Sequence, residues 1–318
     1  MAISLGEYRV ALDSKDDEAN VNFVSHAHAD HISGLRKNKK ALASEISRDL
    51  IESRSGMRME LVEEPDCVEL LNAGHMLGSR QLYLENDLYG YSLIYSGDYQ
   101  LAESIIAEKM EIKKADVLII DSTYPNPEIK FDDKNEVITS IQHYAKMKLD
   151  KGNVLFGAYA VGKAQELVKI LNEVGIVPVV SSKISEANKV YAKYGVDLKY
   201  SELEKDASVK ENFVGIVEQS KLNEMREEIS ARSSRRVFTA VASGLAKLFR
   251  FGTDVQFALS DHADFSQAID YINACSPKIV FTFGSNSKVF AKNLVLRGYD
   301  ARPLQHTSEV NGLMLNYI

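Results

Sequence analysis

The chain carries, at residues 25–31, the heptapeptide Ser25-His26-Ala27-His28-Ala29-Asp30-His31. Three of the seven histidines therefore fall within a few positions of one another, interleaved with an aspartate. Alternate residues of an extended segment project to the same side, so His26 and His28 can reach one metal ion. Asp30 and His31 follow as the chain turns and can reach a second ion. A single histidine is more often a surface or core residue, but this density predicts a loop that binds zinc or a similar divalent ion.

Four short apolar runs lie just before reactive side chains. They cover residues 21–24 before the heptapeptide, 67–71 before His75, 91–95 before Asp98 and 117–120 before Asp121. Each run ends in a turn residue, as buried strands do. Because loops at the edge of a rigid sheet carry functional groups, the four runs predict one site assembled at one sheet edge.

From about residue 134 the pattern changes to helices alternating with strands. Helical patterns cover residues 135–149, 163–174 and 185–194, and apolar runs cover residues 153–156, 177–180, 237–241 and 255–259. This alternation is typical of a small parallel sheet. A last α/β stretch covers residues 265–273, 278–283 and 288–297, whereas the charged segment 201–236 gives no clear pattern.

Length and composition limit the classes of protein to consider. The 318 residues suffice for one large core or two smaller ones, and 45% hydrophobic with 26% charged residues is typical of a globular protein. With a formal charge of −7, contact with nucleic acid would need a local basic groove or the charge of bound metal. Cys67 and Cys275 stand far apart, which argues against a disulfide framework and excludes a zinc site of thiolates.

The start of the chain bears on its location. Residues 1–9 carry charges where a signal peptide would need an apolar run. No stretch approaches the ~20 apolar residues that cross a bilayer. We therefore expect a cytoplasmic protein without membrane contact.

The heptapeptide resembles the HxHxDH signature of the metallo-β-lactamase superfamily, and further motifs follow in the family's order. Asp13 resembles the buried aspartate that orients the histidine loop. His75, in Gly74-His75, resembles the ligand of the third motif, and Asp98, in Gly97-Asp98, resembles the carboxylate that bridges two metals. Each dipeptide alone carries no weight, but the ordered set does.

Later motifs resemble the β-CASP branch of that superfamily, which consists of nucleases acting on DNA or RNA. Residues 121–124 resemble its motif A, residues 157–166 its strand followed by Gly-Arg-Ala-Gln-Glu, with Lys163 for arginine, and residues 259–264 its motif B. The helix at 185–191 also matches. The resemblance implies an α/β fold: a metallo-β-lactamase αββα sandwich with an inserted small parallel α/β (β-CASP) domain. The expected domains are residues 1–148 and 257–318 for the sandwich and 149–256 for the insertion.

The chain departs from the branch at motif C. Phe283 stands where RNA-processing members carry the histidine that completes the second metal site, and an aromatic ring cannot ligate zinc. The DNA-acting members, which include Artemis and the cross-link repair nucleases, also lack that histidine. Residues 121–127, Asp-Ser-Thr-Tyr-Pro-Asn-Pro, resemble their form of motif A. Both features favour DNA over RNA, although the chain also resembles archaeal or bacterial exonucleases that process mRNA 3′ ends.

The resemblance implies roles for the site residues. The first zinc would be held by His26, His28, His75 and Asp98, and the second by Asp30, His31 and Asp98. The second ion lacks a fourth protein ligand, so we expect it to bind more weakly, with manganese as a substitute. Asp30 and Asp121 are also expected to act in catalysis. His262 would be the general acid supported by Asp121, and the alternative is that His262 is a ligand of the second metal.

Substrate contacts and the function follow from the same reading. Lys163, Ser243 and Gly244 are candidates for binding phosphate, because a helix N-terminus and a lysine together attract an anion. The favoured function is a single-stranded DNA 5′ exonuclease, and the alternative is an RNA-processing endo- or exoribonuclease of the same fold. A small-molecule metallo-hydrolase is disfavoured by the β-CASP-like middle, and an inactive binding subunit by the retained ligands. A protein partner remains unidentified.

Overall fold

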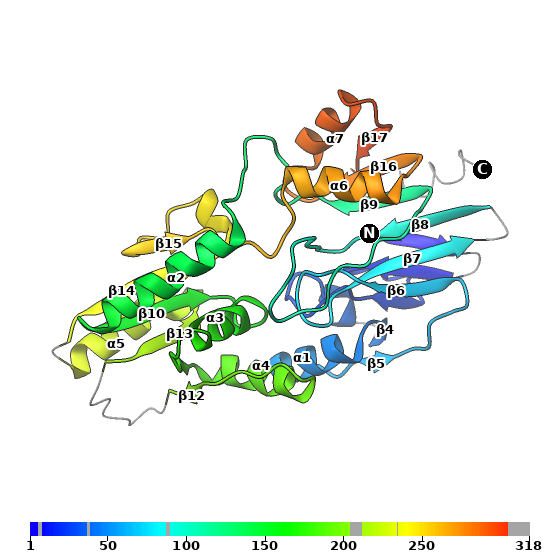
Figure 1. Cartoon of the computed structure of the whole chain (residues 1–318). Coiled ribbons are helices and arrows are strands. Elements are labelled where there is room, and N and C mark those ends of the chain that lie inside the picture. The colour runs from blue at the N-terminus through cyan, green and yellow to red at the C-terminus, as the bar shows by residue number, and fades with distance from the viewer. Residues whose placement is uncertain (6–7, 37–38, 87–89, 204–211, 234, 305–318) are drawn as a thin grey trace. The chain divides into compact units, whose positions relative to one another are not determined.

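The structure, a computed structural model, describes residues 1–5, 8–36, 39–86, 90–203, 212–233 and 235–304. The chain divides into two units. Unit 1 consists of Met1–Lys130 and His262–Ile318, and unit 2 is the insertion Phe131–Asp261, which runs from green to yellow in Figure 1. None of the helices in these described parts is long and apolar enough to cross a membrane.

Two sheets form unit 1. The first has the order β1-β2-β3-β4-β5, with the bounds Ala2–Leu5, Tyr8–Leu12, Val21–Phe23, Lys40–Leu42 and Glu60–Leu61. The second has the order β17-β16-β9-β8-β7-β6. In chain order its strands are β6 Val68–Asn72, β7 Arg80–Asn86, β8 Tyr91–Tyr95, β9 Val117–Asp121, β16 Ile279–Phe283 and β17 Ala301–Pro303. Only β1-β2, β6-β7 and β7-β8 are antiparallel among the described pairs of these sheets.

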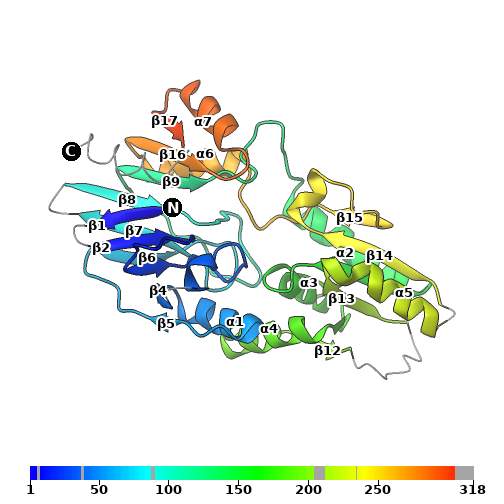
Figure 2. The same cartoon turned by 180° about the vertical axis from the view of Figure 1, so that it is seen from behind.

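The second sheet is buried on both faces because successive apolar side chains alternate between two cores. Leu93 and Tyr95 of β8 pack between the two sheets, against residues such as Phe23. Ile94 points the other way, into a second core. That core includes Tyr271 of α6 (Phe265–Cys275) and Phe290 of α7 (Ser287–Val295). α1 (Glu45–Ser55) lies beside β4 and β5 (Figures 1 and 2). The predicted αββα sandwich is confirmed.

Local sequence signals fix where the helices of unit 1 begin. Asp264 caps α6: its carboxylate accepts from the backbone N–H of Gln267 at 3.0 Å, and the Gln267 side chain accepts from the N–H of Asp264 at 3.1 Å. This reciprocal capping box satisfies two of the helix's unpaired donors. The Ser44 hydroxyl caps α1 through the N–H of Ser47, and Gly56, with φ of 65°, ends that helix in the left-handed conformation.

Unit 2 is built on a parallel sheet with the order β12-β11-β13-β10-β14-β15. In chain order the strands are β10 Asn153–Ala158, β11 Val179–Val180, β12 Ser201–Glu202, β13 Val214–Glu218, β14 Val237–Ala242 and β15 Val255–Phe257. Its helices are α2 Lys134–Leu149, α3 Lys163–Asn172, α4 Ser182–Lys193 and α5 Leu222–Arg232. The predicted parallel α/β insertion is present, and the segment without a clear pattern contains β13 and α5.

The chain passes between the two compact units at Lys130–Phe131 and at Asp261–His262. The division into residues 1–148, 149–256 and 257–318, which the resemblance implies, stays a prediction. α2 belongs to unit 2 because its buried face packs there. The Tyr144 ring meets Phe156 of β10 edge to face, and the Gln142 amide donates to the carbonyl of Ile170 in α3 at 3.0 Å.

Candidate metal centre

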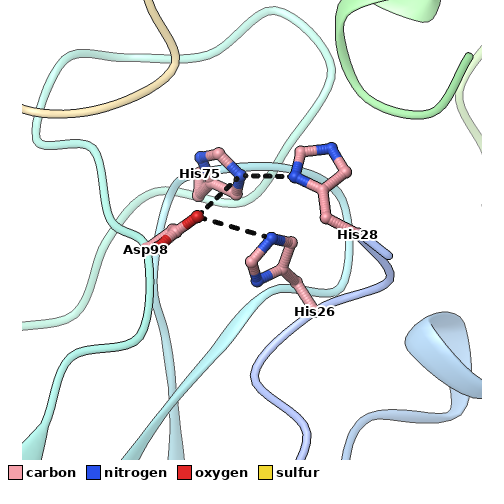
Figure 3. Close-up of side chains that lie close together, drawn as sticks. All are labelled: His26, His28, His75 and Asp98. Atoms are coloured by element: carbon pink, nitrogen blue, oxygen red, sulfur yellow. Dashed lines mark hydrogen bonds and ion pairs between the residues drawn. The ribbon is translucent and has the colours of Figure 1, made fainter. Parts of the chain in front are cut away.

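Four side chains from three loops converge in unit 1. His26 and His28 follow β3, His75 follows β6, and Asp98 follows β8. One donor atom of each lies within 4.8 Å of the others, and the three imidazoles and the carboxylate point toward one another (Figure 3). These are the four residues that were expected to hold the first metal. The prediction of a single sheet edge is wrong, because β3 belongs to the first sheet and β6 and β8 belong to the second.

Asp98 lies at the centre of a larger set of histidines. Its Oδ2 atom is 3.6 Å from Nε2 of His26, 3.3 Å from Nε2 of His31, 3.9 Å from Nε2 of His75 and 3.8 Å from Nε2 of His262. Ligands about 2.0–2.1 Å from a tetrahedral zinc ion stand about 3.3 Å apart. The spacing of these donors therefore suits divalent ions held between them.

The state of His26 tests whether the residues fit a metal. Its Nδ1 lies 2.9 Å from the Ser25 hydroxyl, whereas its buried Nε2 makes no hydrogen bond within the described parts of the chain. Burial, and then the neighbouring His31 and His28, lower the pKa of His26 well below its usual range. A low pKa favours the neutral ring, whose Nε2 can ligate a metal when the ring proton is on Nδ1 beside the Ser25 hydroxyl.

Asp13 supports the histidine loop from behind. Its Oδ1 accepts from the N–H of Ser25 at 2.7 Å, and its Oδ2 lies 2.9 Å from Nδ1 of His31 and 3.0 Å from the Tyr95 hydroxyl, which donates to it. Burial opposes a charge on His31, but Asp13 and Asp98 outweigh it and raise the His31 pKa well above its usual value. With Nδ1 held by Asp13, Nε2 of His31 is aimed at Asp98.

Replacing Asp13 with asparagine should weaken metal binding about 10–100-fold. This is the usual effect of removing a carboxylate that orients a metal-binding histidine, as Asp13 orients His31. Asparagine tolerates the positive φ of 47° at this position, so the change removes charge with little added backbone strain. The measurement is metal affinity by competition with a chelating dye. Asp16→Asn, which removes an acidic group paired with Arg9 instead, is the matched control. Unchanged affinity in Asp13→Asn would contradict the orienting role.

A second group of side chains centres on His262. Its Nδ1 lies 3.2 Å from Oδ2 of Asp121, and one donor atom each of Asp98, Asp121 and His262 lie within 4.8 Å of one another. The other carboxylate oxygen of Asp121 accepts from the N–H and hydroxyl of Thr123 at 3.0 and 2.7 Å. Burial raises the pKa of Asp121, and the contact with His262 opposes that rise. His262 is thus oriented through Nδ1 and presents Nε2 to Asp98.

Gly284 keeps the space that this arrangement needs. Its φ is 95°, and a Cβ there would lie 2.8 Å from Oδ1 of Asp121. Gly284→Ala should lower the free energy of unfolding by about 1–3 kcal/mol through backbone strain and should also lower turnover by displacing Asp121. Gly298→Ala is the control, since Gly298 has a φ of 89° with nothing within 4 Å of the added carbon. The free energy of unfolding in urea and the turnover rate are measured for both variants. Equal losses of stability and rate in Gly284→Ala and Gly298→Ala would mean that crowding of Asp121 is unimportant.

Phe283 occupies the motif C position in a structural role. Its ring stacks on Tyr95 with centroids 5.2 Å apart, and its carbonyl accepts from the N–H of Ser122 at 2.7 Å. It offers no ligand atom through its side chain. Near this position the available imidazole is that of His262, whose Nδ1 contacts Asp121 and whose Nε2 lies 3.8 Å from Oδ2 of Asp98.

Asp30 lies differently from what the sequence suggested. Its side chain is 83% exposed, and its Oδ2 is 3.7 Å from Nε2 of His31. It stands at the end of the histidine loop and faces solvent, so its carboxylate would have to turn inward to ligate a second ion. The described donor groups that lie within 4.8 Å of one another do not include it.

The predicted phosphate contacts all lie in unit 2. The Lys163 side chain is 1% exposed, and its Nζ is 2.6 Å from Oε2 of Glu166 and 3.5 Å from Oδ2 of Asp261. Two carboxylates thus surround the ammonium, which argues against a direct phosphate contact. Ser243 is buried and caps a short 3-10 helix, Gly244–Lys247, by accepting from the N–H of Leu245 at 3.2 Å.

Several supporting residues were missed by the sequence reading. The Ser25 hydroxyl lies near both His26 and His31, and Thr123 fixes one oxygen of Asp121. Gly97, with φ of 52°, lets the chain pass Ser25, because a Cβ there would lie 2.6 Å from the serine Cβ. Their places in the sequence could have indicated this role. Ser25 lies in the heptapeptide 25–31 and Thr123 in the motif at 121–124, where small hydroxyl residues can orient the neighbouring side chains.

Comparison with known proteins gives a consistent set of relatives. A scan against protein-family models found no match. The chain is 30% identical over 293 residues to "Probable DNA ligase" of Opitutus terrae, which covers 88% of this chain and 28% of the relative. It is 30% identical over 189 residues to "RNase J-like protein" of Methanocaldococcus jannaschii, covering 49% of this chain and 44% of the relative. It is 25% identical over 168 residues to "DNA cross-link repair 1A protein" of Mus musculus, and this match covers 48% of this chain and 16% of the relative. The chain thus spans less than half the length of each of these relatives.

Proposed function

The chain belongs to the β-CASP branch of the metallo-β-lactamase superfamily, and on that premise we propose that it is a metal-dependent nuclease that hydrolyses phosphodiester bonds. The observation that carries the proposal is the approach of four imidazoles to one oxygen of Asp98. Such a set of imidazole nitrogens around a buried carboxylate suits a pair of divalent ions at the edge of the sandwich.

The donor set supports zinc as the resident ion. His26, His28, His75 and Asp98 would hold the first ion, and His31, Asp98 and an inward-turned Asp30 would hold the second. Nitrogen and oxygen donors without a thiolate suit zinc and also accept manganese. The second set relies on an exposed carboxylate and should therefore bind its ion more weakly.

Hydrolysis of a phosphodiester needs a strong nucleophile and relief of negative charge. Bound divalent ions would supply an activated water and would neutralise phosphate oxygens. His262 would donate a proton to the leaving oxygen from Nε2, since Asp121 holds Nδ1 and stabilises the charged ring. In the alternative role, Nε2 of His262 would ligate the second ion, which its 3.8 Å separation from Asp98 also suits.

The finer proposal is a 5′ exonuclease of single-stranded DNA. The relative that covers 88% of the chain is named a DNA ligase, and the mouse relative is named a DNA cross-link repair protein. Phe283 in place of a motif C histidine and the form of motif A also support DNA. The polarity rests on the resemblance to the DNA-acting members alone. The relative named RNase J-like supports the alternative, an RNA-processing nuclease.

Digestion of end-labelled strands tests this proposal. Single-stranded DNA and RNA of one sequence, each labelled at either the 5′ or the 3′ end, are incubated with manganese or zinc. We expect faster loss of DNA and release of the 5′ label as a short product at the earliest times. Faster cleavage of RNA would favour the alternative, and early internal products would rule out an exonuclease. Asp98→Ala protein purified in parallel controls for contaminating nucleases.

A further inference from the structure

The loop that leads from β14 to β15 in unit 2, yellow in Figure 1, exposes apolar and cationic side chains next to one another. Residues 247–250, Lys-Leu-Phe-Arg, are all exposed, with 44% of Leu248 and 59% of Phe249 open to solvent. The stretch 243–253 carries two cations and no carboxylate, whereas the whole chain has a formal charge of −7. Residues 247–250, named the aromatic loop below, are thus a local basic segment of an acidic chain.

Hydrogen bonds hold the backbone of the aromatic loop. The Gln256 amide donates to the carbonyl of Ala246 at 2.6 Å and to that of Phe249 at 2.8 Å. Its Oε1 accepts from the N–H of Phe251 at 3.3 Å, and the N–H of Phe249 donates to the carbonyl of Leu245 at 2.9 Å. Because Gln256 belongs to β15, the sheet itself supports the loop. The exposed Phe249 side chain is therefore carried by a backbone that is already fixed.

Two cations flank the exposed ring in sequence, and both are accessible to an anion. Arg250 is exposed and forms no ion pair with the residues that the structure describes. Nζ of Lys247 lies 3.5 Å from Oδ2 of the exposed Asp132. An ion pair this open to water is weak, so its ammonium can exchange the carboxylate for another anion. The charges of the aromatic loop therefore remain available to phosphate groups.

A second exposed aromatic leaves the same end of the sheet of unit 2. β10 and β14 pair in parallel with Gly157 opposite Val241, so the segments that follow both strands start at the carboxyl end of the sheet. One of these segments begins with Tyr159, which is 48% exposed. Tyr159 and Phe249 are the two aromatics among the large exposed hydrophobic side chains that the structure describes. Ligands of open α/β sheets bind at the carboxyl ends of the strands, which is where both segments start.

We propose that the aromatic loop is a subsite for single-stranded nucleic acid, in which a base stacks on the Phe249 ring and adjacent phosphates contact Lys247 and Arg250. A flat ring beside cations suits an unpaired strand, because every base offers a π face and every linkage a negative charge. In a duplex the bases are already stacked on one another, so the loop selects unpaired strands. This inference deepens the proposed nuclease function and rests on it. It moves the predicted phosphate contact from Ser243 and Gly244, which are buried, to exposed residues of the same loop.

Tryptophan fluorescence tests the stacking directly, because the chain contains no tryptophan of its own. Phe249→Trp places a single reporter in the aromatic loop and keeps a stacking surface. The probe is oligothymidylate of about 12 nucleotides with phosphorothioate linkages, which resist hydrolysis. We expect binding to quench the emission, and an abasic strand of the same length to quench it little. Val177→Trp is the matched control, because Val177 is 54% exposed but precedes β11 at the amino end of the sheet, so its emission should stay unchanged.

Affinities separate stacking from ionic and simple apolar contact. Phe249→Ala and Phe249→Leu should each raise the Kd of the strand about 5–100-fold, the loss expected for one stacked base, and Phe249→Trp should not. Lys247→Gln and Arg250→Gln should each reduce the slope of log Kd against log salt by about 0.7, whereas Phe249→Ala should leave the slope unchanged. The replaced side chains are exposed, so these variants should fold. Oligouridylate in a parallel titration identifies whether DNA or RNA binds more tightly.

Several outcomes would overturn the subsite. They are an unquenched Phe249→Trp, quenching of Val177→Trp to the same degree, and an unchanged Kd in Phe249→Ala or Phe249→Leu. An unchanged Kd in Phe249→Ala would leave the exposed ring to a protein partner instead.

Binding is measured without cleavage, so the failure of this inference is distinct from the failure of the proposed function. If the wild-type protein cleaves no nucleic acid while Phe249→Trp is quenched as expected, the proposed function fails and the subsite stands. If the wild-type protein cleaves nucleic acid while Phe249→Trp is not quenched, the proposed function stands and the subsite fails.

Discussion

Asp98→Ala should reduce the rate of nucleic-acid cleavage by at least about 10³-fold and should lower the metal content of the protein. Asp98 is the one carboxylate in the group with His26, His28 and His75, and its Oδ2 also approaches His31 and His262. Its own pKa is informative: burial would raise it, but His262 and His31 outweigh burial and hold it well below its usual range. Asp98 is therefore ionised, and its negative charge would offset that of divalent ions held by the centre.

Metal content and rate must be measured on the same preparations. Elemental analysis after dialysis gives the ions per chain, and single-turnover cleavage gives the rate. Asp98→Asn keeps the shape and removes the charge, so we expect a loss nearly as large. His143→Ala removes an exposed histidine of α2 and controls for histidine content alone. An Asp98→Ala protein that keeps its metal and its rate would contradict the assignment of the whole centre.

His262→Ala should lower kcat by about 10²–10⁴-fold, the usual contribution of a general acid. Asp121→Asn should cost about 10–100-fold, because it leaves the imidazole in place but removes the carboxylate 3.2 Å from Nδ1. The double variant should be no slower than His262→Ala, since the two residues act as one unit. Additive losses would indicate that Asp121 acts on the reaction independently of His262.

The leaving group distinguishes the two roles of His262. A nitrophenyl ester of a nucleotide releases nitrophenolate, which departs without a proton. If His262 is the acid, His262→Ala should retain most of its activity on this ester while losing it on DNA, and its metal content should match the wild type. If His262 is a ligand, both activities and about half of the metal should be lost together.

Element types in the fold were largely predictable, and the reason lies in burial. The runs at 21–24, 67–71, 91–95 and 117–120 became β3, β6, β8 and β9. Strands buried on both faces carry nearly continuous apolar residues, and strands buried on one face alternate apolar with polar residues, so both kinds leave a signal in the sequence. β7 and α1 were not predicted. α1 buries only Ser47, Leu50 and Ile51, so it shows a weak helical pattern, and its caps are the stronger signal.

The convergence of the metal-binding candidates also followed from the sequence, whereas the surroundings of single side chains did not. Density and order indicated that His26, His28, His75 and Asp98 belong together. The exposure of Asp30 depends on how the loop turns after His28. The pairing of Lys163 with Asp261 depends on contacts between segments far apart in the chain, which periodicity and spacing do not record.

The register between β9 and β16 has a consequence for how the chain folds. These strands pair side by side, with Asp121 opposite Phe283, although all of unit 2 separates them in sequence. Closing so long a flexible loop carries an entropic penalty and slows the search for the pairing. If the insertion folds first, it replaces that loop with a compact body, so the order of synthesis and the rate of late strand pairing should govern how quickly Asp121 and His262 meet.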